Sequence, residues 1–294
     1  MACEHEQTLE VEHEIVMYSG DIVFYKNGNV IGELTVVPNY YFYYNNNDDD
    51  FYFGYKISEN IKNVKLLKVE TVGSSAFYGC SALTCIDLPK CTTVSDYAFQ
   101  GCTALTSIDL PKCTTVGDFA FNYCTKLTSI DLPVCESIDG GAFEYCSALT
   151  SIDLPKCTTV GDYAFDSCSK LTSVDLPECT SVDEGAFYDC AALTSVNLPK
   201  CTSVGTYAFY DCSALTSIDL PVCESIDYGA FVECTSLATV ILRSPNLVTL
   251  SDTLAFLDTS PDLCIYVPDD LVEEYLTDAY WGSYEIKPLS ELPK

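Results

Sequence analysis

Positively charged residues are scarce in this 294-residue chain. Lysine and arginine total 14 against 43 aspartate and glutamate residues, which gives a formal net charge of −29 at pH 7. A chain this negative is repelled by nucleic-acid phosphates and by anionic membrane surfaces. We therefore expect no nucleic-acid partner. The charge is either that of a solvated acidic surface or a feature that favours a cationic partner or metal ions.

Long apolar runs are also missing. No stretch approaches the roughly 20 apolar residues of a membrane-spanning helix, so we expect no membrane insertion. The opening residues, MACEHEQTLEVEHEIV, contain neither the basic nor the apolar region of a secretion signal. Either the protein is not exported by that route or a leader has been removed. A further alternative is that Cys3 is the lipidated cysteine of a trimmed lipoprotein.

Histidine is limited to His5 and His13. No Ser–His–Asp set can be assembled around these two residues, and no glycine-rich phosphate loop follows a strand. The cysteines lack the close pairs typical of zinc sites. The sequence therefore predicts no enzyme, no catalytic residue, no cofactor and no metal cluster.

A strict repeat dominates the rest of the chain. Eight phenylalanines recur every 22 residues without insertion: Phe77, Phe99, Phe121, Phe143, Phe165, Phe187, Phe209 and Phe231. A short fixed period predicts a solenoid, because each unit can bury its apolar faces only against its neighbours. With 48% hydrophobic residues, the chain can build such a core. The open ends of a solenoid expose apolar rungs and strand edges, so both ends need caps.

One unit, residues 105–126, reads LTSIDLPKCTTVGDFAFNYCTK. Its SID segment alternates polar and apolar residues, which predicts a strand with one wet face that the following proline ends. The β-branched TTV segment favours a second short strand. The Gly-Asp pair predicts a turn, in which Asp118 is the N-cap of a short helical turn over residues 119–121.

Two parts of this unit, L-x-x-I-x-L-P and V-G-x-x-A-F-x-x-C-x-x-L, resemble the BspA-like leucine-rich repeats, also called the Treponema pallidum type. The A-F-x-x-C half makes the resemblance specific, because ordinary leucine-rich repeats lack it. The resemblance implies a right-handed α/β solenoid, mostly β with short helical turns, whose strand face is concave. It also implies surface proteins of bacteria and parasitic protists that bind host matrix or other cells. Similar arrays occur in phage-encoded proteins.

We expect three parts along the chain. Residues 1–60 form an N-terminal β-hairpin cap region, residues 61–258 the leucine-rich repeat array, and residues 259–294 a small α/β C-terminal cap. The last unit of the array contains a three-residue insertion, because Phe256 follows Phe231 by 25 residues.

Fifteen of the 18 cysteines occupy two repeat positions: Cys80, Cys102, Cys124, Cys146, Cys168, Cys190, Cys212 and Cys234, and Cys91, Cys113, Cys135, Cys157, Cys179, Cys201 and Cys223. Disulfides between rungs would be ambiguous, because each rung has equivalent neighbours on both sides. We therefore interpret these cysteines as small buried hydrophobes. Free thiols suit the cytosol, an anaerobic habitat or a well-buried core. Cys3, Cys85 and Cys264 lie outside the pattern.

The two ends break the period. Alternating apolar residues around Asn27-Gly28 predict a β-hairpin. Two aromatic runs around the polar turn 45–50 predict a second hairpin. One face of it would pack on the first repeat and the other would offer a candidate binding surface with Tyr41, Tyr43, Tyr52 and Tyr55. At the C-terminus we expect a strand and then a helix from an Asp269 N-cap to about residue 279. We expect its apolar face to contain Leu271, Tyr275 and Leu276, with Trp281 as its anchor.

The wet strand positions form the main candidate binding face: Asp87, Asp109, Asp131, Asp153, Asp175, Asp219, Ser107, Ser129 and Ser151. Like charges on neighbouring rungs repel each other. One interpretation of the retained carboxylates is a stripe that binds calcium or a basic partner. The other, which we favour, is structural: the carboxylates bond neighbouring Ser and Thr hydroxyls, or were copied with the repeat. Equivalent, wet carboxylates do not form the unlike, desolvated pair that acid–base catalysis needs.

These observations predict a non-enzymatic, monomeric binding protein, extracellular or at the cell surface. It would engage a protein or glycan on another cell through the concave repeat face or the aromatic hairpin. The alternative is a structural spacer or receptor-binding component of a phage tail or surface assembly. An intracellular scaffold is the third reading.

Overall fold

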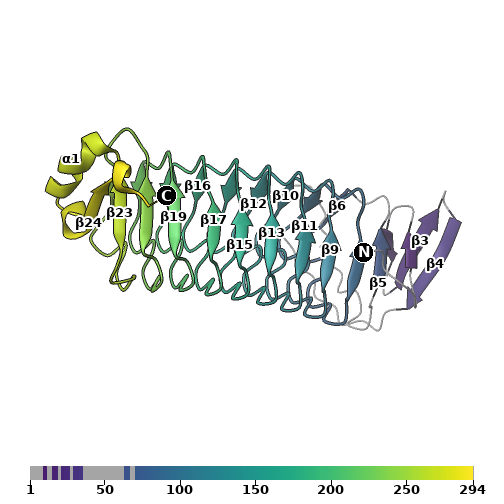
Figure 1. Ribbon diagram of the computed structural model, residues 1–294. Helices are drawn as coiled ribbons and strands as arrows, with labels where there is room; N and C mark the ends of the chain where they lie inside the picture. Colours follow the sequence, from purple (N-terminus) through teal and green to yellow (C-terminus); the bar gives the residue numbers. More distant parts are fainter. Residues whose placement is uncertain are drawn as a thin grey trace, which may run out of the picture.

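The computed structural model describes residues 70–293 and, before them, the backbone of the strands at 9–11, 15–18, 21–26, 29–35 and 63–66. The repeats stack into an elongated rod of parallel strands, which confirms the predicted solenoid (Figure 1). Each 22-residue unit forms one rung, with one strand in each of two sheets. Within the described part of the chain, no helix is long and apolar enough to span a membrane.

The SID segments form the first sheet, which we call the strand face. Its order is β1 (Leu9–Val11), β5 (Asn63–Leu66), β7 (Cys85–Asp87), β9 (Ser107–Asp109), β11 (Ser129–Asp131), β13 (Ser151–Asp153), β15 (Ser173–Asp175) and β17 (Ser195–Asn197). A four-stranded sheet follows it: β19 (Ser217–Leu220), β21 (Thr239–Leu242), β23 (Cys264–Val267) and β24 (Glu285–Pro288). Apart from β1, these strands follow each other in chain order, as expected of a solenoid.

The β-branched segments form the second sheet, of two-residue strands. They are β6 (Thr71–Val72), β8 (Thr93–Val94), β10 (Thr115–Val116), β12 (Ser137–Ile138), β14 (Thr159–Val160), β16 (Ser181–Val182), β18 (Ser203–Val204), β20 (Ser225–Ile226) and β22 (Thr249–Leu250). All of them pair in parallel with identical register, for example Val116 opposite Ile138. The predicted second strand is therefore confirmed.

The third side of each rung, which we call the turn face, is a run of turns. The predicted short helical turn is wrong, because Phe119 and Tyr123 have positive φ angles of 53° and 58°, outside the helical region. Asp118 is not an N-cap. Its carboxylate instead accepts the N–H of Gly140 in the next rung, at 2.9 Å.

Backbone hydrogen bonds explain why the turn face is not helical. The N–H of Ala120 bonds the carbonyl of Gly117 within its own rung at 3.2 Å, whereas the N–H of Phe121 bonds Ala142 in the next rung at 2.7 Å. A helix would keep its N–H groups within the segment. Because of the left-handed residues, every second N–H group of the turn face points toward the next rung and bonds a carbonyl there. Neighbouring rungs are therefore joined by backbone hydrogen bonds on the third side as well.

The first left-handed position of the turn face alternates between aromatic residues and glycine: Tyr97, Phe119, Gly141, Tyr163, Gly185, Tyr207 and Gly229. A Cβ on Gly185 would lie 2.4 Å from Cε1 of the Tyr163 ring in the preceding rung. In the same way, a Cβ on Gly141 would clash with the Phe119 ring, and a Cβ on Gly229 with the Tyr207 ring. Glycine satisfies both the positive φ and the lack of space. From Phe119 onward, two kinds of rung therefore alternate.

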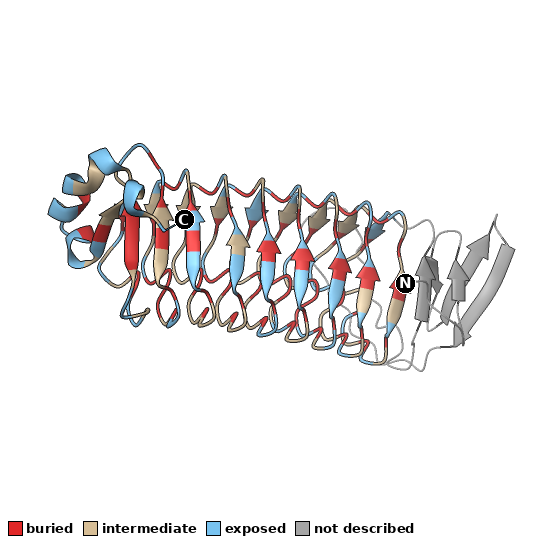
Figure 2. Cartoon of the chain, viewed as in Figure 1, coloured by how far each residue is buried: buried red, intermediate tan, exposed pale blue. Residues whose placement is uncertain are grey.

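The core consists of ladders of like side chains, seen as buried bands along the rungs (Figure 2). The phenylalanine rings stack with nearly parallel planes, for example Phe99 on Phe121 with centroids 5.1 Å apart. The ladder continues across the three-residue insertion, because Phe231 stacks on Phe256 at 5.1 Å. Burying each ring contributes about 1.5–3 kcal/mol relative to exposure.

The C-terminal segment lies over the end of the phenylalanine ladder. Trp281, fully buried, contacts Phe256 with centroids 6.0 Å apart and donates its indole N–H to the Val248 carbonyl at 2.7 Å. Tyr275 is also fully buried, as predicted, and its hydroxyl accepts the N–H of Val248 at 3.0 Å. These contacts cover the last aromatic rung with rings that also satisfy its backbone polar groups.

Three details of the C-terminal prediction are wrong. The helix α1 (Val272–Thr277) is shorter than expected and follows the short 3-10 helix η1 (Asp269–Leu271); two more, η2 (Trp281–Ser283) and η3 (Leu289–Glu291), come later. Asp269 is not its N-cap: the carboxylate accepts the N–H of Ser290 at 3.0 Å. Leu276 is 45% exposed and does not belong to the buried face.

At the other end, β2 (Ile15–Tyr18), β3 (Asp21–Lys26) and β4 (Asn29–Thr35) form an antiparallel sheet. Lys26 pairs with Asn29, the register required by the hairpin predicted at Asn27-Gly28. The second predicted hairpin, with Tyr41, Tyr43, Tyr52 and Tyr55, lies outside the described residues.

Candidate binding surface

The SID strands place their polar side chains outward, as the alternation predicts. In β11 and β13 the serine and aspartate are exposed, whereas Ile130 and Ile152 between them are only 7% and 4% exposed. Of the other predicted residues, Asp109, Asp153, Asp175 and Asp219 are exposed and Asp87 and Ser107 are half-buried. The strand face therefore presents the predicted set as columns of hydroxyl and carboxylate groups.

The aspartates stand directly opposite one another. Asp131 pairs in register with Asp109 on one side and with Asp153 on the other, and Asp153 with Asp175. Within the described residues, no hydrogen bond or ion pair involves the side chains of Asp131 and Asp153. The structural alternative, in which the stripe bonds Ser and Thr hydroxyls, thus does not describe these two carboxylates.

Toward the C-terminal end of the stripe, the aspartate side chains have hydrogen-bond partners. Asp175 accepts a hydrogen bond from Nδ2 of Asn197 at 2.7 Å. Asp219 accepts two-pronged hydrogen bonds from Arg243, at 3.0–3.1 Å. Arg243 compensates the charge of Asp219, whereas Asp131 and Asp153 on the central rungs have no such partner in the described residues.

Threonine hydroxyls beside the strands have a structural role. The Thr128 hydroxyl donates to the carbonyl of Thr106 at 3.0 Å, and Thr172 donates to Thr150 at the same distance. These bonds run from rung to rung along the edge of the strand face. The hydroxyls therefore supplement the backbone ladder, and their donors are already engaged.

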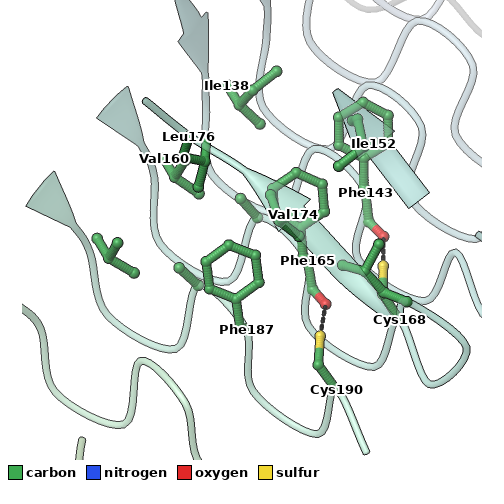
Figure 3. Close-up of a cluster of buried hydrophobic side chains, with 14 of the residues drawn as sticks. Ile138, Phe143, Ile152, Val160, Phe165, Cys168, Val174, Leu176, Phe187 and Cys190 are labelled. Atoms are coloured by element: carbon green, nitrogen blue, oxygen red, sulfur yellow. Dashed lines mark hydrogen bonds between the residues drawn. The ribbon is translucent and has the colours of Figure 1, made fainter. Parts of the chain in front are cut away.

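The cysteines form two buried ladders. In the described residues, 16 cysteines are buried thiols outside any disulfide, whereas Cys85 is disulfide-bonded. In one ladder each thiol donates to a phenylalanine carbonyl of the preceding rung: Cys168 to Phe143 and Cys190 to Phe165, both at 3.2 Å (Figure 3). The prediction of small buried hydrophobes is confirmed, with an added role as hydrogen-bond donors.

The buried thiols are not set up as nucleophiles or metal ligands. Burial raises the pKa of Cys157 to about 11 and that of Cys113 to about 12. A thiol acts as a nucleophile or ligand in its deprotonated form, which these shifts oppose at neutral pH. In residues 70–293, no group of three or more His, Cys, Asp or Glu side chains could hold a metal ion.

The stacked array defines a class of protein. Each 22-residue rung joins a buried-leucine strand, a short β-branched strand and an A-F-x-x-C turn, which is the architecture of a leucine-rich repeat solenoid. A model of the BspA type leucine-rich repeat region, in six copies, matches residues 49–171 and 136–261. The chain therefore belongs to the BspA-type leucine-rich repeat family.

Solved structures similar to this chain are also leucine-rich repeat proteins. One from Bacteroides ovatus is 22% identical, with coverage of 95% of this chain and 98% of that one and a TM-score of 0.34. A leucine-rich cell surface protein from Faecalibacterium prausnitzii is 22% identical (70% and 78% coverage, TM-score 0.36). The T. pallidum leucine-rich repeat protein is 24% identical (78% and 86% coverage, TM-score 0.44). No curated protein matches the chain.

Proposed function

We propose that this protein is a non-enzymatic adhesion protein, exposed at a cell surface, that engages a protein or glycan on another cell through its strand face. The observation that carries the proposal is the in-register row of exposed aspartates on the central rungs, of which Asp131 and Asp153 have no side-chain partner among the described residues. Membership in a leucine-rich repeat family supports a binding role.

The uniformity of the strand face suits a multivalent contact. Ser129, Ser151 and their equivalents repeat the same hydroxyl and carboxylate pattern on successive rungs. A partner with several weak attachment points gains affinity when neighbouring points bind in the same encounter. Matrix polymers and glycan chains have such repeated groups. A single deep pocket is not required for this mode of binding.

Binding of the labelled protein to animal epithelial cells and matrix, beside a panel of bacterial cells, tests the proposal. Ser151→Arg blocks the strand face. Thr159→Arg is the matched control, because Thr159 is an exposed strand residue of the same rung in the other sheet. We expect saturable binding to the animal surface that Ser151→Arg weakens at least tenfold and Thr159→Arg leaves within twofold.

The outcomes are distinguishable. Equal binding by both variants would overturn the strand face as the binding surface. Binding to bacteria alone would favour a phage or interbacterial role, and no binding to any surface would favour a structural spacer. Repeating the titration with a calcium chelator tests the alternative in which calcium links the aspartate stripe to its ligand, and loss of binding on chelation would support that alternative. Unchanged binding would leave the carboxylates to contact the partner directly.

A further inference from the structure

The turn face is where neighbouring rungs differ most. We define the turn-face stripe as the residue pairs 122–123, 144–145, 166–167, 188–189, 210–211 and 232–233, which precede the cysteine in the six successive A-F-x-x-C turns from Cys124 to Cys234. These pairs read NY, EY, DS, YD, YD and VE, whereas the strand face repeats SID or a near variant on every rung. The stripe thus presents different side chains on successive rungs, whereas the strand face presents nearly the same ones on each rung.

Two stacked pairs of tyrosines occupy the turn-face stripe. Tyr123 and Tyr145 take its second column, with ring centroids 4.6 Å apart, and are 48% and 37% exposed. Tyr188 and Tyr210 take its first column, 4.4 Å apart, and are half-buried. The Tyr207 ring packs edge-on against Tyr210, with ring centroids 5.7 Å apart, and adds a third ring to the second pair. Exposed, stacked tyrosines are common in protein-binding surfaces.

Carboxylates occupy most of the other positions of the stripe. Glu144 and Asp166 precede Tyr188 in the first column, and Asp189, Asp211 and Glu233 follow Tyr145 and Ser167 in the second. The ion pairs of the described residues involve none of these five groups. Aromatic and acidic side chains therefore exchange columns near the middle of the stripe, and each tyrosine pair has carboxylates beside it.

These carboxylates repel one another. The pKa of Asp211 is raised by partial burial and then by the charges of Asp189 and Glu233. The pKa of Asp166 is raised for the same two reasons, with Asp189 as the charged neighbour. Glu233 also accepts the Tyr210 hydroxyl at 2.6 Å, so its charge is held beside the ring. A cation placed here would relieve this repulsion.

The stripe is long enough for a short extended peptide. Six rungs at the strand spacing of about 4.8 Å span roughly 24 Å, which matches about seven residues of extended chain. Between residues 183 and 236 the chain has eight acidic residues and one basic residue, Lys200. Lys200 bonds Glu178 at 2.6 Å, so no free lysine of this segment competes for the stripe.

We propose that the turn-face stripe is a docking surface for an extended lysine- or arginine-rich segment of a partner protein. Its cationic groups would lie against the tyrosine rings and pair with the adjoining carboxylates. The proposal goes beyond adhesion through the strand face. A partner can shift by one rung along a uniform surface at little cost, whereas the order of tyrosines and carboxylates in the stripe specifies one register.

Fluorescence anisotropy with a labelled hepta-arginine peptide tests the proposal, with hepta-glutamate as the negative probe. The double variant Tyr188→Leu/Tyr210→Leu removes the ring faces and keeps apolar bulk, whereas Tyr188→Phe/Tyr210→Phe keeps the rings. We expect the leucine variant to bind hepta-arginine at least tenfold more weakly and the phenylalanine variant within threefold of the parent. Thermal unfolding verifies that each variant is folded.

Two further variants separate the stripe from the general negative charge. Tyr280→Leu removes a tyrosine that is 42% exposed but lies in the C-terminal segment, outside the turn face. Asp131→Asn/Asp153→Asn removes two charges from the strand face. We expect both to bind hepta-arginine within twofold of the parent at 150 mM salt. Equal affinity across all variants would show that net charge alone attracts the peptide, and absent binding would equally overturn the proposal. Neither result bears on adhesion through the strand face.

Discussion

The alternation of glycine with aromatic rings makes a quantitative prediction for Gly185→Ala. The residue has φ +58°, a conformation that costs an L-residue about 1–2 kcal/mol. The new Cβ would also lie 2.4 Å from Cε1 of Tyr163, far inside van der Waals contact. The ring must move, which breaks the hydrogen bond from its hydroxyl to Glu184 at 2.6 Å. Overpacking of this kind costs about 1–3 kcal/mol.

The expected loss of unfolding free energy is thus about 2–5 kcal/mol, measured by urea denaturation. Gly101→Ala is the matched control, because Gly101 also has a positive φ of +73° but its added Cβ would meet nothing closer than 3.6 Å. It should lose only the backbone contribution. In the double variant Tyr163→Ala/Gly185→Ala the ring is absent, so the cost of Gly185→Ala should fall to that of the control. Equal losses for Gly185→Ala and Gly101→Ala, or additive effects in the double variant, would refute the reasoning.

Two further predictions concern the end of the array and the buried thiols. Trp281→Ala removes the indole N–H bond to Val248 and the last ring of the aromatic ladder, so it should cost about 3–5 kcal/mol in urea denaturation. Tyr280→Ala, at a neighbouring residue that is 42% exposed, should cost little, and equal losses would contradict this account. The raised thiol pKa values of about 11 for Cys157 and about 12 for Cys113 predict alkaline destabilisation. A raised folded-state pKa contributes stability that is present below the unfolded value of 9.0 and lost as pH rises toward the folded value. Each thiol should cost about 1.4 kcal/mol per pH unit in that window, and an unchanged urea midpoint between pH 8 and pH 10.5 would contradict it.

The strands and the core could be predicted from the sequence, because they depend on the periodic spacing of apolar residues. The spacing from Phe99 to Phe121 sets the rung, and the alternation around Ile108 sets which strand side chains face water. Both follow from periodicity, which survives in any environment that buries one face. The outward columns of the strand face follow from the same rule.

The turn face could not be predicted in the same way. Local preference favours a helical turn over residues 119–121, but Phe119 adopts a left-handed conformation that aromatic residues rarely take. Phe119 adopts this conformation because its N–H donates to a carbonyl of the next rung, that of Gly140. The adjacency of Tyr145 and Asp166 likewise depends on stacking of turns whose conformation was unknown. Interactions between rungs determine both the conformation of Phe119 and this adjacency, and local sequence preferences do not include such interactions.

The cysteine ladders have a consequence for how long the protein survives in air. In the closed array, thiols such as Cys168 and Cys190 are buried and hold their protons against backbone carbonyls. A rung that opens exposes thiols of neighbouring rungs together, and oxygen then converts them to sulfenic acids or to new disulfides that prevent reclosure. Where oxidation of the opened rung is faster than reclosing, inactivation is governed by the rate of opening and not by the equilibrium free energy of unfolding. The time for which the protein stays active in air then depends on how slowly its rungs open.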